Sequence, residues 1–203
     1  WHIFQETMAP GGPLGRWTDA GMVVQAYLRD SEEHTRQVMA FARRRGTPFR
    51  VRLVKGAYWD QEVIVAEQSD WPVPVYQDKN ATDLTFERIV GLLLDSSPLT
   101  QVAVASHNVR AHAHAEAVRE AVGLPEDAVE HQTLYGTLAG LSRALTRMGW
   151  VARDYVPVGD LISGMAYLVR RILENTSQAG FLARNRLRED AAELLRAPQP
   201  GPE

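Results

Sequence analysis

Short apolar runs alternate along the chain with longer segments of helical periodicity. The apolar runs predict β-strands at Gly21–Tyr27, Phe49–Val54, Gln101–Ala105, Val129–Leu134 and Ala152–Val158. The periodic segments predict helices at Ser31–Arg45, Asp60–Gln68, Thr82–Asp95, Asn108–Val122, Thr137–Met148 and Leu161–Asn175. A strand–helix unit thus recurs five times, the pattern of a parallel sheet wrapped by helices.

The regions outside this repeat differ in composition. Residues 1–20 are rich in Gly and Pro and are predicted to form a loop leading into the repeat, which occupies residues 21–177. Residues 178–196 are predicted as a C-terminal helix, and residues 197–203 as a disordered tail or linker. The chain begins with Trp1 rather than Met, which suggests a fragment, a processed chain or a trimmed chain.

Two α/β architectures compete for such a repeat, a doubly wound open sheet and a (β/α)8 barrel. A dinucleotide-binding open sheet would carry GxGxxG at its first strand–helix turn, and the sequence has no such motif. Polar residues gather instead at the carboxyl ends of several strands, where barrel enzymes place their sites. The barrel is therefore favoured, although closing it takes eight strands and ~250 residues.

Composition and charge narrow the function classes. A chain of 203 residues with 45% hydrophobic residues and a formal net charge of −3 is typical of a soluble globular protein. It offers no basic patch for nucleic acid and no apolar run of the roughly 20 residues that a membrane span needs. Without cysteine, and with no histidine pair at zinc-binding spacing, it predicts neither disulfides nor a metal site. Nothing at the start of the sequence resembles a signal peptide. We expect a cytoplasmic location.

Three strand ends carry polar residues with a choice of roles. Arg52 should point inward near the end of its strand, where it needs an anion or an electron-rich group, unless it pairs at the surface with Asp60. Gln25 interrupts an apolar strand and requires a hydrogen-bond partner. Residues 106–108 (SHN) open a helix, so they could offer backbone donors to a phosphate or simply cap the helix.

The last periodic helix carries a narrow polar stripe. Its members are spaced i, i+3, i+4 and i+7 and share one face: Tyr167, Arg170, Arg171 and Glu174. Adjacent guanidinium groups provide two planar forks that match a carboxylate. The alternative is a solvated helix face with an ion pair between Arg170 and Glu174.

Four stretches together resemble the flavin-dependent proline dehydrogenase barrel of bacterial bifunctional proline-utilisation enzymes. They are VVQAYLRD (23–30), RLVKGAYWDQEV (52–63), ASHN with EHQTLYG (105–108 and 130–136) and YVPVGDLISGMAYLVRRILENTSQAGFL (155–182). They occur in the family's order and cover nearly the whole chain. The resemblance implies that only about the last five strand–helix units of the (β/α)8 barrel are present. An active-site lysine and aspartate of the family's earlier strands have no counterpart here.

The resemblance also implies roles for particular residues. Catalytic roles would fall to Arg52, beside the flavin N5, and to Tyr155, Arg170 and Arg171. The substrate would be held by Tyr58, Leu134, Tyr155, Tyr167, Arg170 and Arg171, with the two arginines on its carboxylate. The FAD cofactor would be held by Gln25, Arg52, Val54, Lys55, Gly56, Ala57, Trp59, Ser106, His107, Asn108, Gln132 and Glu174.

The implied reaction is oxidation of L-proline to Δ1-pyrroline-5-carboxylate by hydride transfer to FAD, the first step from proline to glutamate. A quinone would accept the electrons, which implies a peripheral position at the inner face of the membrane. A fused or partner Δ1-pyrroline-5-carboxylate dehydrogenase domain would lie outside this chain. The alternatives are a catalytically incomplete barrel fragment and a cofactor-free barrel such as an aldolase or isomerase.

Overall fold

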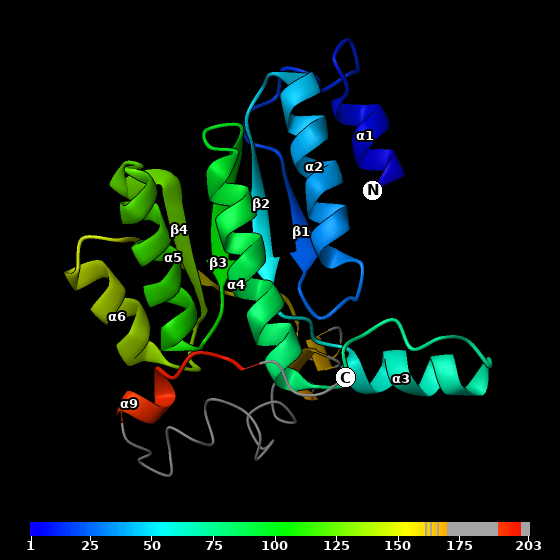
Figure 1. Cartoon of the computed structure of the whole chain (residues 1–203), viewed down its shortest axis with the longest axis vertical. Coiled ribbons are helices and arrows are strands. Elements are labelled where there is room, and N and C mark those ends of the chain that lie inside the picture. Colours follow the sequence, from blue (N-terminus) through cyan, green and yellow to red (C-terminus); the bar gives the residue numbers. More distant parts are fainter. Residues whose placement is uncertain (161, 163, 166, 170–190, 200–203) are drawn as a thin grey trace.

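The computed structural model describes residues 1–160, 162, 164–165, 167–169 and 191–199. Its strands are β1 (Gly21–Gln25), β2 (Phe49–Val54), β3 (Thr100–Ala105), β4 (Val129–Leu134) and β5 (Val151–Tyr155). Its α-helices are α1 (His2–Met8), α2 (Ser31–Arg45), α3 (Trp59–Gln68), α4 (Lys79–Asp95), α5 (Val109–Val122), α6 (Ala139–Arg147) and α9 (Ala191–Leu194) (Figure 1). A short 3-10 helix, Glu126–Ala128, precedes β4.

The five strands form one parallel sheet in the order β1-β2-β3-β4-β5. Each strand pairs with the next in the chain, as in Val24 with Leu53 and Leu53 with Val104. A doubly wound sheet would reverse direction from an inner strand, so this order supports the barrel architecture. The five strands are neighbouring, consecutive strands of a barrel wall.

The helices cover one face of this wall. Figure 1 shows α2, α4, α5 and α6 ranged along the same side of the sheet. We call this side the convex face and the opposite side the concave face. In β2, alternate residues Phe49, Val51 and Leu53 are completely buried on the convex face. Burying each such side chain contributes about 1.5–3 kcal/mol, so the convex face holds the main core.

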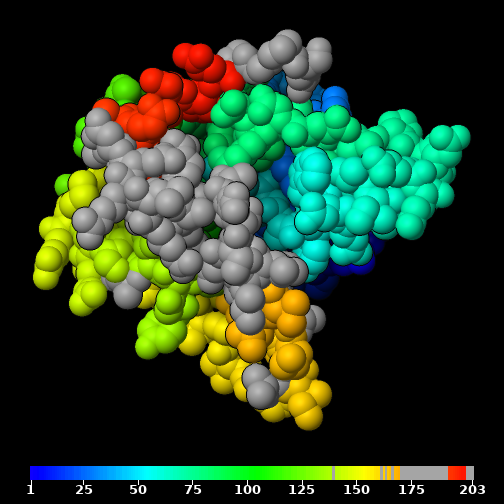
Figure 2. Space-filling view, turned by 90° about the horizontal axis from the view of Figure 1, so that it is seen from below, coloured from blue at the N-terminus to red at the C-terminus, as the bar shows by residue number. Residues whose placement is uncertain are grey.

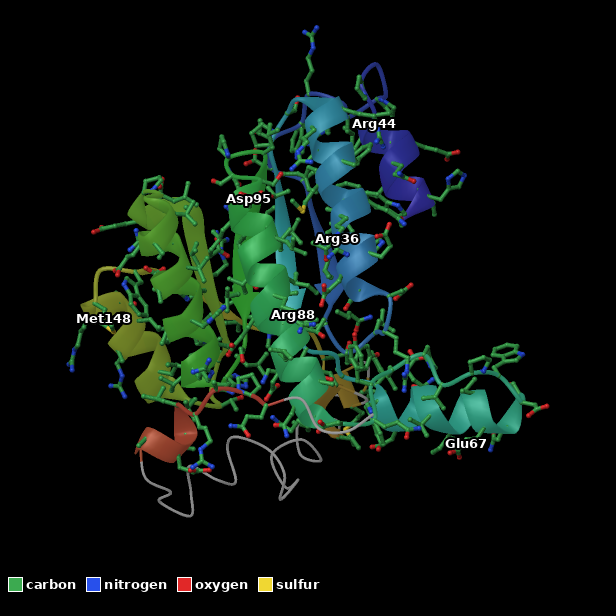
Figure 3. All side chains as sticks on the ribbon, in the orientation of Figure 1. Arg36, Arg44, Glu67, Arg88, Asp95 and Met148 are labelled. Carbon is green, nitrogen blue, oxygen red and sulfur yellow. The ribbon has the colours of Figure 1, made fainter. Side chains whose placement is uncertain are left out.

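The outer sides of these helices are charged. Figure 3 shows Arg36 on α2 and Arg88 on α4. Both arginines reach Glu32, at distances of 3.4 Å and 3.3 Å between nitrogen and oxygen. Exposed pairs of this kind contribute only about 0–1 kcal/mol each, so the buried side of the helices dominates their attachment.

Residues 1–20 were predicted to form a loop, but the structure places helix α1 at His2–Met8. Trp1 and Phe4 hold it in place. The Phe4 ring lies 5.3 Å from that of Phe49, and the Trp1 ring 5.5 Å from that of Phe41. Aromatic burial thus stabilises a helix that the Gly- and Pro-rich composition did not predict.

Several predicted boundaries also shift for identifiable reasons. Helix α4 begins at Lys79 rather than Thr82, because the side chain of Asp78 accepts a hydrogen bond from the Asn80 amide (2.9 Å). Strand β5 ends at Tyr155, two residues before Pro157, which has no amide hydrogen to continue the ladder. Helix α2 has the predicted bounds, with Asp30 at its N-cap position.

The C-terminal predictions are only partly within the described residues. Residues 162, 164–165 and 167–169 are helical, as predicted for this segment. Of the predicted helix 178–196, α9 is described and residues 178–190 are not; of the predicted tail, residues 197–199 are described. None of the described helices combines the length and apolar character that crossing a membrane requires.

Candidate functional site

The concave face of the sheet is polar where the convex face is apolar. Alternation in β2 and β4 places Arg50, Arg52, Glu130 and Gln132 on this side. A cavity of about 340 Å³ runs along it from the start of β1 to Arg52 and Gln132. Most barrel interiors are filled with branched apolar residues, so this wall is built for polar contacts.

Arg52 is fixed by a neighbour two strands away. Its Nε donates to Oε1 of Gln132 at 2.7 Å, and it is half-buried. In the part of the chain that the structure describes, Arg52 is held by this bond rather than by an ion pair with Asp60. Burial lowers the pKa of Arg52, while the nearby Tyr155 acts in the opposite direction. The inward-facing prediction for Arg52 is therefore confirmed.

Lys55 lies directly after the last residue of β2 and contacts helix α4. Its Nζ lies 2.5 Å from Oδ1 of Asp83. The other carboxylate oxygen, Oδ2, lies 2.7 Å from Nζ of Lys79. Burial lowers the pKa of Lys55, although Asp83 opposes the shift. Burial also acts to raise the pKa of Asp83, but the two lysines outweigh it and the net shift is downward. The ion pair thus joins the segment after β2 to the N-terminal part of α4.

Local packing alone explains why position 56 is a glycine. Its φ is +135°, and a Cβ at this position would overlap the ring of Tyr27. The Tyr27 amide donates to the carbonyl oxygen of the neighbouring Lys55 at 2.8 Å. Glycine is therefore needed here for the packing of Tyr27, before any ligand is considered.

The SHN turn, residues 106–108, caps α5 as one of the sequence alternatives had it. Oγ of Ser106 accepts from the Asn108 amide, and Oδ1 of Asn108 accepts from the Arg110 amide, each at 3.0 Å. The Leu134 amide donates to Nε2 of His107 at 3.1 Å. These bonds occupy two amides at the start of α5 and tie the turn to the end of β4.

The region between the first turns of α4 and α5 holds a second cavity of about 320 Å³. Lys55, Asp83 and Asn108 line it, and residues 193–194 and 196–199 border it. Arg110 secures this border: it pairs with Glu87 at 2.7 Å and donates to the Leu195 carbonyl oxygen at 2.7 Å. Figure 2 looks onto this end of the molecule, where the strands finish.

The predicted aromatic residues lie around the same end. The rings of Tyr155 and Tyr167 are 6.2 Å apart, and Tyr155 pairs in register with Leu134 of β4. The indole Nε1 of Trp59 donates to the Tyr76 carbonyl oxygen at 2.7 Å. Tyr58 is exposed nearby at the start of α3.

The remaining predicted residues divide into two groups. Gln25 and Val54 are register partners at the ends of β1 and β2, and Ala57 is exposed just beyond. Arg170, Arg171 and Glu174 lie outside the described residues. The structure therefore brings together the strand-end residues and Tyr167, and it does not describe the proposed carboxylate clamp.

Two polar clusters escaped the sequence interpretation. Glu130 is buried on the concave face, and strand alternation with Gln132 was the signal that could have found it. On the convex side, His112 and His131 meet at 2.9 Å between their Nδ1 atoms. Oε1 of Glu116 lies 3.0 Å from His131 Nε2, and its Oε2 accepts a hydrogen bond from Arg119 Nε at 2.7 Å. His112, Glu116 and Arg119 share one face of α5, but no local pattern linked that face to His131 on β4.

Comparisons with known proteins agree on one family. A family model described as "Proline dehydrogenase" matches residues 1–184. Hydroxyproline dehydrogenase of Bos taurus is 32% identical over 177 residues, which cover 80% of this chain and 38% of that protein. Bifunctional protein PutA of Escherichia coli K12 is 33% identical over 180 residues, covering 84% of this chain and 13% of that protein.

A solved structure gives the same result. Proline utilization A (PutA) from Bdellovibrio bacteriovorus matches with a TM-score of 0.92 and 45% identity, over 97% of this chain and 20% of that one. The match and the sequential strand order confirm the predicted barrel class. The chain spans well under half the length of these relatives.

Proposed function

Because the chain belongs to the proline dehydrogenase family, we propose that it carries the flavin-binding wall of an enzyme that oxidises L-proline to Δ1-pyrroline-5-carboxylate. The observation that carries this proposal is the position of Arg52. It is half-buried on the concave face, near the carboxyl end of β2, and held by Gln132. A fixed cation there would stabilise negative charge that develops on a bound group.

The residues present fit FAD by the chemistry of their donors. Arg52 and Gln25 lie at the ends of neighbouring strands, where an isoalloxazine ring needs a cation and a hydrogen-bonding edge. Lys55 and Arg110 line the cavity beside the SHN turn, and each is paired with a carboxylate. The four cations that line this cavity still outnumber its three carboxylates, which suits the pyrophosphate. When bound, FAD supplies the two-electron acceptor that no amino-acid side chain provides.

Other side chains would bind and orient the substrate. Tyr155 and Tyr167 lie side by side and would pack against a small ring, with Leu134 and Tyr58 completing an apolar wall. Arg170 and Arg171 would hold the substrate carboxylate by paired hydrogen bonds. We further assign the electrons to a quinone, the next oxidation to a fused or partner dehydrogenase domain, and the enzyme to the cytoplasmic side of the membrane.

One experiment tests the proposal and its alternatives. The visible spectrum of the chain mixed with FAD is recorded before and after anaerobic L-proline, and separately with hydroxyproline because one relative is named for it. Bleaching of a bound flavin by either substrate supports the proposal and selects the substrate. Flavin that binds without bleaching would indicate an incomplete site. A chain that binds no flavin would contradict the proposed wall.

A matched pair of variants then tests Arg52. Arg52→Ala should slow flavin reduction about 100-fold, since removing one preorganised donor typically costs that much. Arg88→Ala, on the outer side of α4, removes the same charge and should leave the rate unchanged (Figure 3). Equal rates for the two variants would remove Arg52 from the mechanism.

A further inference from the structure

A chain of polar contacts crosses the concave face and ends on Arg52. Gln132 accepts from Arg52 and donates its Nε2 to Oε1 of Glu130 at 2.6 Å. Arg153 grips the Glu130 carboxylate with two nitrogens, each at 2.9 Å, and Arg50 approaches it at 3.3 Å. Glu130 is only 6% exposed, whereas Arg153 is 62% exposed, so the carboxylate is the buried centre of this group.

The groups at the two ends of this series of contacts, Arg52 and Glu130, fix the direction of its hydrogen bonds. A guanidinium can only donate hydrogen bonds, and an ionised carboxylate can only accept them. Between Arg52 and Glu130, the Gln132 amide therefore has one satisfactory orientation, with its oxygen toward the arginine. Reversed, the amide would present N–H groups to Arg52 and oxygen to oxygen at Glu130. The carboxylate thus determines which atom of Gln132 faces Arg52.

We infer that Glu130 is a positioning residue for Arg52, acting through the orientation of the Gln132 amide. Glu130 does not contact Arg52 in the structure; the effect passes through Gln132 alone. Arg153 and Arg50 neutralise and hold the carboxylate, and they have no bond to Gln132 among the described contacts. The consequence for flavin chemistry rests on the proposed function, but the orientation of Arg52 does not.

The primary test needs no cofactor. Hydrogen exchange of the Arg52 Nε–H with water is followed by NMR in the chain as it stands, and the signal is assigned by its loss in Arg52→Lys. Glu130→Gln should accelerate this exchange at least tenfold, because a neutral amide at 130 no longer dictates one orientation of Gln132. Glu126→Gln, an exposed site with the same charge change, should leave the exchange rate unchanged.

A rescue separates orientation from general loss of structure. In Gln132→Glu the side chain at 132 accepts from Arg52 whichever way it turns, so adding Glu130→Gln should leave the Arg52 exchange slow. The double variant also restores the original net charge. Arg153→Gln should change the rate by less than about threefold, because Glu130 keeps its carboxylate. Unchanged exchange in Glu130→Gln, or fast exchange in the double variant, overturns the inference.

The second readout concerns bound FAD. A misplaced Arg52 should weaken the preference for reduced over oxidised flavin about tenfold, which corresponds to a midpoint potential about 30 mV lower. An unshifted potential in Glu130→Gln would overturn the role of Glu130 in the loaded protein. If the wild-type chain binds no FAD, the proposed function fails while the exchange result still decides whether Glu130 positions Arg52.

Discussion

The two faces of the sheet are made from alternate residues of the same strands, yet they differ in almost every property. On the convex face Val24, Leu53 and Val104 are at most 1% exposed and pack under the helices. On the concave face Arg52 and Glu130 form hydrogen bonds and ion pairs. The contrast teaches that stability and site chemistry are separated by one residue step along each strand. Substitutions can therefore address one face without the other.

The largest expected effect tests the convex face. Leu53→Ala should lower the free energy of unfolding by about 3 kcal/mol, because it removes completely buried methyl groups and leaves a cavity under α4. Val54→Ala, the next residue and half-buried on the concave side, should cost less than about 1.5 kcal/mol. Urea unfolding measures both. Similar losses at the two positions would contradict the separation of the faces.

A smaller effect depends on pH and on the polar part of the convex face. Burial lowers the pKa of His112 to about 4, while its bond to the Ser106 carbonyl oxygen opposes the shift and His131 and His107 add to it. In the unfolded chain the pKa is near 6.5, so between about pH 6.5 and pH 4 only the unfolded state binds this proton. Stability is full above that window and should fall by roughly 2 to 3 kcal/mol as the pH drops through it.

The variant His112→Gln identifies the source of this acid sensitivity. It removes the titrating ring, so the slope of unfolding free energy against pH should become shallower in the same window. Part of the slope should remain, because burial also lowers the pKa of His131 although Glu116 opposes it. Urea unfolding at pH 7 and at pH 4.5 gives the comparison. Identical slopes in variant and wild type would assign the sensitivity elsewhere.

The smallest effect comes from two neighbouring valines of β1. Val24 is 1% exposed on the convex face, and Val23 is 49% exposed on the concave face. Val24→Thr buries a hydroxyl and should cost about 1–3 kcal/mol, whereas Val23→Thr should stay within about 0.5 kcal/mol. The chemical change is the same in both variants. Equal shifts in their unfolding midpoints would show that the faces are not independent.

Local pattern was enough to predict much of the fold. The apolar run at 49–54 predicted strand β2, and alternation along it turned Arg52 inward. The five strands followed from the repeated unit, and the barrel class from the absence of GxGxxG and from the polar residues at the strand ends. Helix α1 was missed because its stability comes from contacts with Phe41 and Phe49, far along the chain. Such tertiary contacts leave no local signature.

The candidate site divides in the same way. Capping of α5 by Asn108 is a local interaction and was foreseen as an alternative. The partners of Arg52 and Lys55 are Gln132 and Asp83, which are distant in sequence and come together only through the sheet and helix packing. The residues at strand ends can be predicted from the sequence. Which of them are in contact depends on the register between strands and on helix packing, which the sequence pattern does not show.

The sequential strand order has a consequence for how the chain acquires its structure. Every strand docks beside the one made just before it, so a chain emerging from the ribosome always has its next docking edge already present. None of the five strands that the structure describes has to be inserted between two others that have already paired. The sheet can therefore grow by simple addition during synthesis, with each new helix sealing the strand that preceded it.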